Sequence, residues 1–195
     1  MLVKNNSKKF KFSFNKSIKY SINEFLSLDM FNPFNQKNYF DKYNLDIFKK
    51  KKFRTYVFGM GGSSLSTKLL AQFLDPNSLG KNLFIFDNPS PVKIKNLLQD
   101  LNINKNDKFI FISKSGNTIE IKYFLHLVIK ILNQKKVSNI FEKFIFITEN
   151  KKNYMKKFAK KNNILCFDHD HNIGGRFSIF SLTALLPLLS IGFSL

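Results

Sequence analysis

The stretch Phe109-Ile-Phe-Ile-Ser-Lys-Ser-Gly-Asn-Thr-Ile119 decides the fold, because it joins an apolar run to a helical pattern through a loop of glycine and hydroxyl residues. Four consecutive apolar residues open it, and such a run is typical of a strand that is covered on both faces of its sheet. Residues 119–132 continue with the spacing of a long helix. The stretch therefore predicts one strand–loop–helix unit of an α/β protein.

The same succession of strand and helix recurs between residues 53 and 167. We expect strands at the apolar runs 56–58, 83–86, 109–112, 144–147 and 164–167. Helical patterns separate them at residues 65–74, 92–101, 119–132 and 153–161. Strands that alternate with helices pair in parallel and are joined by right-handed crossovers. The sequence therefore predicts an α/β domain over residues 53–195, built on a five-stranded parallel sheet flanked by helices.

Two further loops of the same composition follow other strands of the predicted sheet. They are Gly59-Met-Gly-Gly-Ser-Ser64 and Gly174-Gly-Arg-Phe-Ser178, and with Ser113–Thr118 they make three. Ligands of parallel sheets bind beyond the carboxyl ends of the strands, where all three loops are expected. Glycine lets a backbone approach an anion closely, and the N-terminus of the next helix attracts negative charge. The loops therefore predict one site for a phosphorylated small molecule.

Hydroxyl groups suggest what two of these loops bind. Ser113, Ser115 and Thr118 cluster directly before a helix, an arrangement that suits a phosphate monoester. Ser63 and Ser64 supply the same kind of donor in the first loop, where sugar hydroxyls are the expected ligands. Ordinary N-capping by serine and threonine is the alternative for each loop taken alone.

Two nucleotide-binding motifs rank below this interpretation. A Walker A loop needs a lysine after its second glycine, whereas Lys114 precedes the glycine of its loop. A dinucleotide fingerprint needs a third glycine where the first loop has Ser64. Asp87 could mimic the ribose-binding acid of that fingerprint, but the loop at 113–118 would then have no role.

Arg176 is one of only two arginines among 32 basic residues. In so lysine-rich a chain, an arginine can mark a position that needs a planar and permanently charged group. Its function could be to hold a substrate oxygen or to stabilise a developing enediolate. The alternative is a structural ion pair with Asp168 or Asp170.

The composition excludes several classes of protein. The hydrophobic content of 44% is that of a globular domain, and the formal net charge of +19 comes mostly from scattered lysines. Nucleic-acid surfaces rely on arginine, so we expect no nucleic-acid partner and only a general attraction for anionic ligands. The single cysteine, Cys166, excludes an internal disulfide framework and a cysteine-based zinc cluster, and its apolar neighbours predict a buried thiol.

The sequences at the two ends of the chain predict where in the cell the protein is found. The N-terminus has no apolar core of signal-peptide length, so a cytoplasmic protein is expected. Residues 1–52 are expected to form a helical extension, because four apolar residues are spaced for one helical face: Ile18, Ile22, Phe25 and Leu26. Residues 177–195 carry no charge and reach the lower limit of a membrane span. Interspersed serine, glycine and proline favour a helix that is buried inside a larger protein, so no membrane partner is expected. A membrane-associated protein that uses this apolar segment is the alternative.

Three motifs resemble, in order and spacing, those of the glucose-6-phosphate isomerase family. They are Phe58-Gly-Met-Gly-Gly-Ser63, Ile112-Ser-Lys-Ser-Gly-Asn-Thr118 with Glu120, and Asn172-Ile-Gly-Gly-Arg-Phe-Ser178. The last motif is the most specific, and the likeness covers about residues 53–195. It implies the N-terminal SIS (sugar isomerase) domain of that family, which has a flavodoxin-like fold of three layers.

The resemblance also implies roles for particular residues. Gly62 and Ser63 would contact the sugar. Four residues would hold the 6-phosphate: Ser113, Lys114 (through its backbone amide), Ser115 and Thr118. Arg176 would stabilise the enediolate intermediate. The family's reaction interconverts glucose 6-phosphate and fructose 6-phosphate, in glycolysis and gluconeogenesis, through a cis-enediol and without a metal or nucleotide cofactor.

The sequence departs from the family's pattern in its length. Family members are more than twice as long, carry two SIS domains, and have their catalytic glutamate, histidine and lysine downstream of the Gly-Gly-Arg motif. His126, His169 and His171 do not match that histidine, and Glu120 fits a helix-start carboxylate better than the base. We therefore expect an N-terminal portion, truncated or split, that binds the phosphate but lacks the base, and that pairs with a second copy or a complementing C-terminal half. The alternative is a stand-alone SIS domain that binds a sugar phosphate without catalysis.

Overall fold

All five predicted strands pair in one parallel sheet, in a computed structural model that describes residues 23–92, 94–95, 102–103 and 105–194. The strands are β1 (Arg54–Gly59), β2 (Leu83–Phe86), β3 (Asp107–Ile112), β4 (Phe144–Glu149) and β5 (Leu165–His169). Their order across the sheet is β2-β1-β3-β4-β5. This is the flavodoxin-like order, in which the strand order reverses between β1 and β3. The predicted α/β fold is therefore confirmed.

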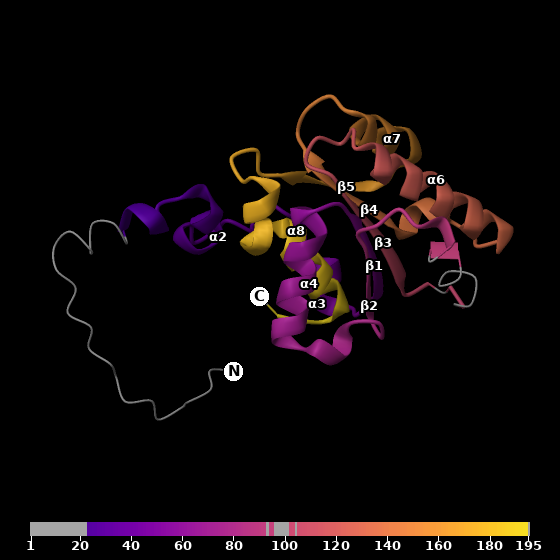
Figure 1. Cartoon of the computed structure of the whole chain (residues 1–195), viewed down its shortest axis with the longest axis horizontal. Coiled ribbons are helices and arrows are strands. Elements are labelled where there is room, and N and C mark those ends of the chain that lie inside the picture. Colours follow the sequence, from indigo (N-terminus) through magenta and orange to yellow (C-terminus); the bar gives the residue numbers. More distant parts are fainter. Residues whose placement is uncertain (1–22, 93, 96–101, 104, 195) are drawn as a thin grey trace.

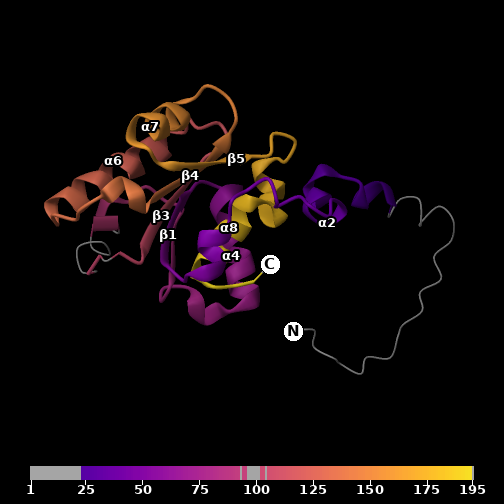
Figure 2. The same cartoon turned by 180° about the vertical axis from the view of Figure 1, so that it is seen from behind.

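Helices cover both faces of the sheet, so the domain has three layers (Figures 1 and 2). One face carries α6 (Ile119–Gln134) and α7 (Tyr154–Asn162). The other carries α3 (Asp46–Lys50), α4 (Gly62–Leu74) and α8 (Leu182–Ile191). The shorter elements are η1 (Asp29–Phe31), α2 (Asn32–Asn35), η2 (Pro76–Ser78), η3 (Ile140–Lys143) and η4 (Gly175–Phe180).

The alternation of phenylalanine and isoleucine in the strands assigns each residue type to one face. Successive side chains of a strand point to opposite faces, so in 109–112 and 144–147 every phenylalanine faces α6 and α7, and every isoleucine faces α4 and α8. Phe58 stacks between Phe86 and Phe111 of the neighbouring strands, with ring centroids 4.6 and 4.8 Å apart. A slip of one residue would exchange the aromatic and aliphatic sets, so this pattern specifies the register of the strands.

The helices lie close to their predicted positions. The helix predicted at 65–74 begins earlier, at Gly62, because Gly61 adopts a φ of 59° and lets the helix start directly after the strand. Of the helix predicted at 92–101, residues 92 and 94–95 are helical, and 93 and 96–101 lie outside the described residues.

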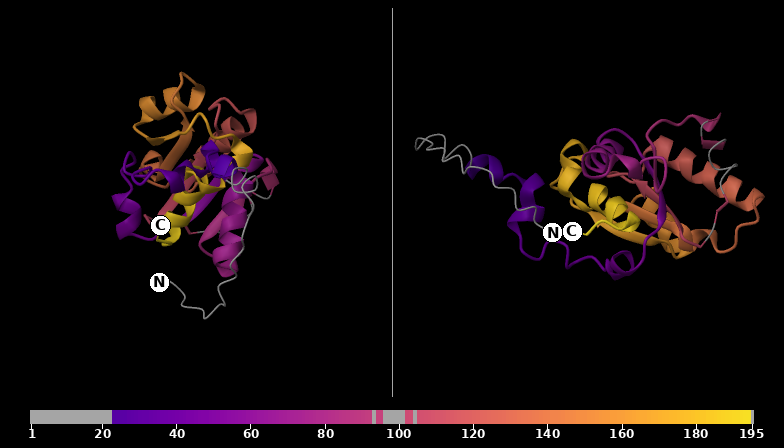
Figure 3. Two further views of the ribbon diagram at one scale, coloured as in Figure 1. Left: turned by 90° about the vertical axis from the view of Figure 1, so that its left-hand side faces the viewer. Right: turned by 90° about the horizontal axis from the view of Figure 1, so that it is seen from below.

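The described part of the N-terminal extension contains short helices joined by turns, and the two described residues of its predicted apolar face are exposed. Residues 23–26 are helical, and Phe25 and Leu26 are 54% and 44% exposed, whereas Ile18 and Ile22 lie outside the described residues. These helices lie beside η4 at one end of the molecule (Figure 3). Further along, the buried side chains of residues 39–53 join the aliphatic core of the sheet.

The uncharged C-terminal segment forms η4 and α8 and packs inside this domain. Eight of the ten residues of α8 are buried, and the helix contacts α4, α3 and β1. Ser190 accepts a hydrogen bond from the Phe53 amide and shares one with the Thr55 hydroxyl at 2.7 Å. Within the described residues, no helix is long and apolar enough to cross a membrane.

Candidate functional site

The three glycine and hydroxyl loops lie at the carboxyl edge of the sheet, as the sequence predicts. The first follows β1 and leads into α4, and the second follows β3 and leads into α6. Because β1 and β3 are neighbours, these two loops flank the point where the strand order reverses. Of the third loop predicted at Gly174–Ser178, all but Gly174 lie in the 3-10 helix η4; this segment and residues 170–173 before it, together called the third loop below, follow β5 and meet the first loop.

Three hydroxyl groups converge in the second loop, at the N-terminus of α6. The oxygens of Ser113 and Thr118 are 2.7 Å apart, and Ser115 lies 3.5 Å from each of them. Thr118 occupies the N-cap position, but its hydroxyl makes no capping bond to α6. Among the hydrogen bonds of the described residues, none is donated by the backbone N–H of Lys114, Ser115 or Thr118. The loop therefore presents hydroxyls and amides that can donate to an anion.

The side chain of Asn153, the N-cap residue of α7, packs against Gly116 of the second loop. Gly116 has a φ of 65°, and a side chain there would overlap the carboxamide of Asn153. That carboxamide accepts a bond of 2.8 Å from the Lys156 amide and donates to the Thr148 hydroxyl at 3.2 Å. The sequence analysis missed Asn153, because an asparagine before a helix predicts a cap and says nothing of a contact with another loop.

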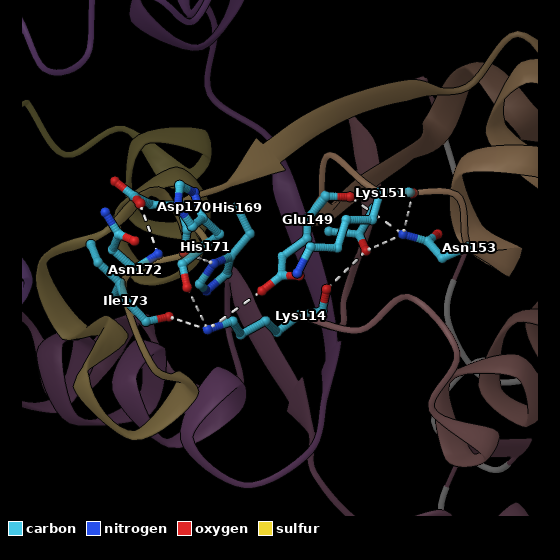
Figure 4. Close-up of polar contacts among 10 residues, drawn as sticks. Lys114, Glu149, Lys151, Asn153, His169, Asp170, His171, Asn172 and Ile173 are labelled. Carbon is cyan, nitrogen blue, oxygen red and sulfur yellow. Dashed lines mark hydrogen bonds and ion pairs between the residues drawn. The ribbon is translucent and has the colours of Figure 1, made fainter.

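Lys114 connects the second loop to the third through its side chain (Figure 4). Its ammonium donates to the carbonyls of His171 and Ile173 at 2.9 and 3.1 Å, and pairs with the Glu149 carboxylate at 3.4 Å. Its own carbonyl accepts the amide of Glu149 at 3.0 Å. The lysine that was expected to act through its backbone amide therefore also holds two loops together with its charged end.

The charge of Glu149 is stabilised by two lysines. Burial alone would raise the pKa of this carboxyl, but Lys151 at 3.0 Å and Lys114 outweigh it and hold the pKa below the usual value. Sequence reasoning overlooked Glu149. The sequence gives no local signal for it, because only the strand order, with β4 next to β3, brings this acid beside Lys114.

The first and third loops touch through their backbones. A Cβ built on Gly62 would overlap the carbonyl of Gly175 and lie 2.7 Å from the amide nitrogen of Arg176. Ser63 is 7% exposed at the same junction. The structure therefore brings Gly62, Ser63 and Arg176 together. Through its side chain, Lys114 links the third loop, which carries Arg176, to the hydroxyl cluster of the second loop.

Arg176 is exposed at this edge, and among the described residues it has no ion-pair partner. The alternative partners are engaged elsewhere: Asp168 pairs with Lys156, and Asp170 accepts from the Tyr39 hydroxyl at 3.2 Å. The structural ion pair considered for Arg176 is therefore not formed. Its side chain lines a hollow of about 520 Å³ together with Gly62 and residues of α4.

His169 is buried beside the clamp formed by Lys114 and Glu149, with 4% of its surface exposed. Burial lowers the pKa of its imidazole, although a hydrogen bond to the Asp170 carbonyl opposes the shift. Its Nε2 atom is buried and has no partner among the described residues. The described residues hold no group of three or more side chains that could ligate a metal.

Comparison with known proteins identifies the family. A sequence model described as phosphoglucose isomerase matches residues 47–195. The chain belongs to this family. The resemblance to glucose-6-phosphate isomerases that the three motifs carry is thus confirmed.

Named relatives agree with this assignment. The glucose-6-phosphate isomerase of Methanocaldococcus jannaschii is 35% identical over 154 residues, which are 77% of this chain and 37% of the relative. That of Campylobacter jejuni is 34% identical over 139 residues, or 71% and 34% of the two chains. The crystal structure of a glucose-6-phosphate isomerase from Chlamydia trachomatis superposes with a TM-score of 0.61 at 28% identity, over 76% of this chain and 28% of that one. The chain thus spans about a third of the length of the curated relatives it matches.

Proposed function

We propose that this chain binds glucose 6-phosphate and fructose 6-phosphate and supplies the phosphate-binding part of a glucose-6-phosphate isomerase site. The observation that carries the proposal is the hydroxyl cluster of Ser113, Ser115 and Thr118 at the N-terminus of α6. Uncommitted N–H groups, three hydroxyls and the positive end of a helix dipole are the donors that a phosphate monoester requires. The family membership supports a sugar as the group that carries this phosphate.

The bound sugar phosphate would extend from the second loop towards the first and third. Its phosphate would lie against the hydroxyl cluster and the backbone amide of Lys114, and its hydroxyls against Gly62 and Ser63. The C1–C2 end would then reach the exposed guanidinium of Arg176. A fixed positive charge at that end would stabilise the negative charge that develops on the enediolate oxygen when a proton moves between C2 and C1.

The proton transfer itself requires a base within hydrogen-bond reach of the sugar. The carboxylates of the clamp, of the end of β5 and of the third loop are already engaged: Glu149 with two lysines, Asp168 with Lys156, and Asp170 with Tyr39. We therefore propose that the chain alone binds the sugar phosphate with little turnover, as a cytoplasmic part of glycolysis and gluconeogenesis that needs a base from further polypeptide. Isomerase turnover by the pure 195-residue chain at a rate typical of enzymes would contradict this part of the proposal.

Calorimetric titration with fructose 6-phosphate tests the binding site. A hydrogen bond to a charged group contributes about 1.5–3 kcal/mol, so Ser115→Ala should weaken binding by about tenfold or more. Ser138→Ala is the matched control, because Ser138 is also exposed but lies in the connection after α6, at the far end of that helix. Equal affinities for wild type and Ser115→Ala would show that the phosphate does not bind at this cluster.

A further inference from the structure

Two buried tyrosines of the N-terminal extension hydrogen-bond to the end of β5 and to the third loop. Tyr39 and Tyr43 lie in the turns between α2 and α3 and are 4% and 8% exposed. The Tyr39 hydroxyl donates to the Asp170 carboxylate at 3.2 Å, and that of Tyr43 donates to the Asp168 carbonyl at 3.0 Å. Both tyrosines precede residues 47–195, the part of the chain that matches the family model. Their role therefore has to follow from their contacts.

The rings of the two tyrosines are held in the core of the domain. Both belong to the cluster of buried side chains that also contains Phe48 and Phe167. The Tyr43 ring lies edge-on to that of Phe167, with centroids 6.1 Å apart. Burial raises the pKa of Tyr43 to about 12 and raises the pKa of Tyr39 further, so both hydroxyls are protonated donors at neutral pH. Each tyrosine is thus a rigid donor to the chain that follows β5.

Asp170 connects Tyr39 to the turn that precedes η4. Its Oδ2 atom accepts the Tyr39 hydroxyl, while its Oδ1 atom accepts the amide of Asn172 at 3.1 Å. Its carbonyl accepts the amide of Ile173 at 3.2 Å. The carbonyl of Ile173 in turn accepts from the Lys114 ammonium (Figure 4). The turn at 170–173 is therefore bonded both to a tyrosine of the extension and to the lysine of the second loop, and it leads directly into η4.

A polar cavity of about 570 Å³ lies between the extension and the end of β5. It is lined by residues 42–44 of the extension and by residues 166–172, and most of its lining side chains are carboxyl, carboxamide or imidazole groups. Apolar packing therefore contributes little across it. A separate ring contact, between Phe31 and Phe180 with centroids 6.0 Å apart, joins the extension to η4. At the turn itself, the two tyrosine hydroxyls supply the connection.

We propose that Tyr39 and Tyr43 are positioning residues, which hold the third loop so that Arg176 faces the sugar. They act through Asp170 and the end of β5 rather than on the ligand directly. A loop that is already held in its binding geometry loses less conformational freedom when the ligand binds, so this link raises the affinity for the sugar phosphate. That Arg176 contacts the sugar rests on the proposed function, whereas the hold of the tyrosines on the loop does not.

The double variant Tyr39→Phe, Tyr43→Phe removes both hydroxyls and keeps the buried rings. In the ligand-free protein, hydrogen exchange measured by mass spectrometry should become faster over residues 170–177 and stay unchanged in β3 and α6. Affinity for fructose 6-phosphate, measured by calorimetry, should fall about tenfold, the factor expected for the loss of a hydrogen bond to a charged group. Affinity for inorganic phosphate should stay the same, because phosphate alone does not reach the third loop.

Tyr154→Phe is the matched control. It also removes a bonded hydroxyl, but that hydroxyl lies 3.1 Å from Nε2 of His126, between α7 and α6. Exchange over residues 170–177 and both affinities should therefore match wild type. The same changes in this variant as in the double variant would mean that the loss of any tyrosine hydroxyl loosens the loop.

A double-mutant cycle shows whether Tyr39 acts through the carboxylate of Asp170. Tyr39→Phe should lower the affinity for fructose 6-phosphate in the wild-type background and have almost no effect in the Asp170→Ala background, because the partner of the hydroxyl is then already gone. Losses that simply add would show that Tyr39 acts by another route, and would overturn this part of the proposal.

The remaining outcomes separate this proposal from the proposed function. Wild-type exchange in the double variant would mean that the tyrosines do not hold the loop. Equal losses of affinity for fructose 6-phosphate and for inorganic phosphate would indicate a general loss of structure and overturn the positioning role. If wild type itself failed to bind fructose 6-phosphate, the proposed function would be refuted, and exchange over residues 170–177 would still decide the role of the tyrosines. If the double variant melts at the assay temperature, the same measurements are made on Tyr39→Phe alone, which loses only one hydroxyl.

Discussion

Gly62 and Gly175 lie so close together that no side chain fits between the backbones of the first and third loops. The contact joins the start of α4 to the start of η4, two elements separated by more than a hundred residues of sequence. It places Arg176 next to Ser63 rather than on a free loop. Glycine at position 62 is thus a packing requirement, whether or not the residue also touches a sugar.

Gly62→Ala should therefore destabilise the domain. Overpacking of a well-packed site typically costs about 1–3 kcal/mol, and here the clashing atoms are backbone atoms that can move only with η4. Unfolding in urea, followed by circular dichroism, measures the loss.

Gly174→Ala is the control in the same loop. Gly174 has a φ of −65°, which suits alanine, and its Cβ would lie 3.3 Å from the exposed ring of Phe177. This change should cost well under 1 kcal/mol. Similar losses for the two variants would mean that the loops can separate and that their contact contributes little.

The link between Lys114 and the third loop predicts a coupling between phosphate and sugar binding. Lys114→Met keeps the apolar stem but removes the donor of two carbonyls, and the side chain is 33% exposed, so a loss of about 1–2 kcal/mol in unfolding free energy is expected. Affinity for fructose 6-phosphate should fall more than affinity for inorganic phosphate, because only the sugar reaches the loop of Arg176. Calorimetry with both ligands gives the comparison.

Lys151→Met separates this effect from the general loss of a positive charge. Lys151 also pairs with Glu149, at 3.0 Å, but its side chain is 71% exposed and it makes none of the bonds to the third loop. This variant should change the two affinities by similar small factors. If Lys151→Met and Lys114→Met changed the ratio of the affinities for fructose 6-phosphate and inorganic phosphate equally, the bonds of Lys114 to the third loop would not couple phosphate binding to sugar binding.

The strands could be predicted from the sequence because their signal is local. An apolar run such as 109–112, ended by a glycine loop, predicts a buried strand and where it stops, whatever surrounds it. The alternating phenylalanines and isoleucines then specify which face each residue covers. The same holds for the hydroxyl cluster, since Ser113, Ser115 and Thr118 are close in sequence and a single turn brings them together.

The contacts between loops could not be predicted, because each joins residues far apart in the chain. Glu149 lies 35 positions after Lys114, and only the strand order places them side by side. The sequence also could not predict which face of α4 is buried. Its leucines suggest an ordinary buried stripe, but η4 and α8 pack against the opposite face, which carries the small residues. The C-terminal segment, expected to be buried in a larger protein, is buried in the core of this domain.

His169 predicts how the stability of the domain depends on pH. Its Nδ1 lies 2.6 Å from the Asp170 carbonyl oxygen, which can only accept a hydrogen bond. Nδ1 therefore carries the proton of the neutral imidazole, and the buried Nε2 is unprotonated. Burial lowers the pKa of this imidazole below its usual value of 6.5 in the folded protein. The unfolded chain therefore binds a proton at His169 below about pH 6.5 that the folded domain does not bind. The unfolding free energy should fall as the pH drops through this range, by at most about 1.4 kcal/mol per pH unit from this residue, with no contribution above it.

His169→Asn isolates this contribution, because asparagine keeps a donor for the Asp170 carbonyl but does not titrate. Urea unfolding between pH 5 and 7 should show a shallower pH dependence for the variant than for wild type, since the other titrating groups remain in both. Equal slopes for wild type and His169→Asn would mean that His169 is protonated in the folded domain, and hence that water or another group reaches its Nε2.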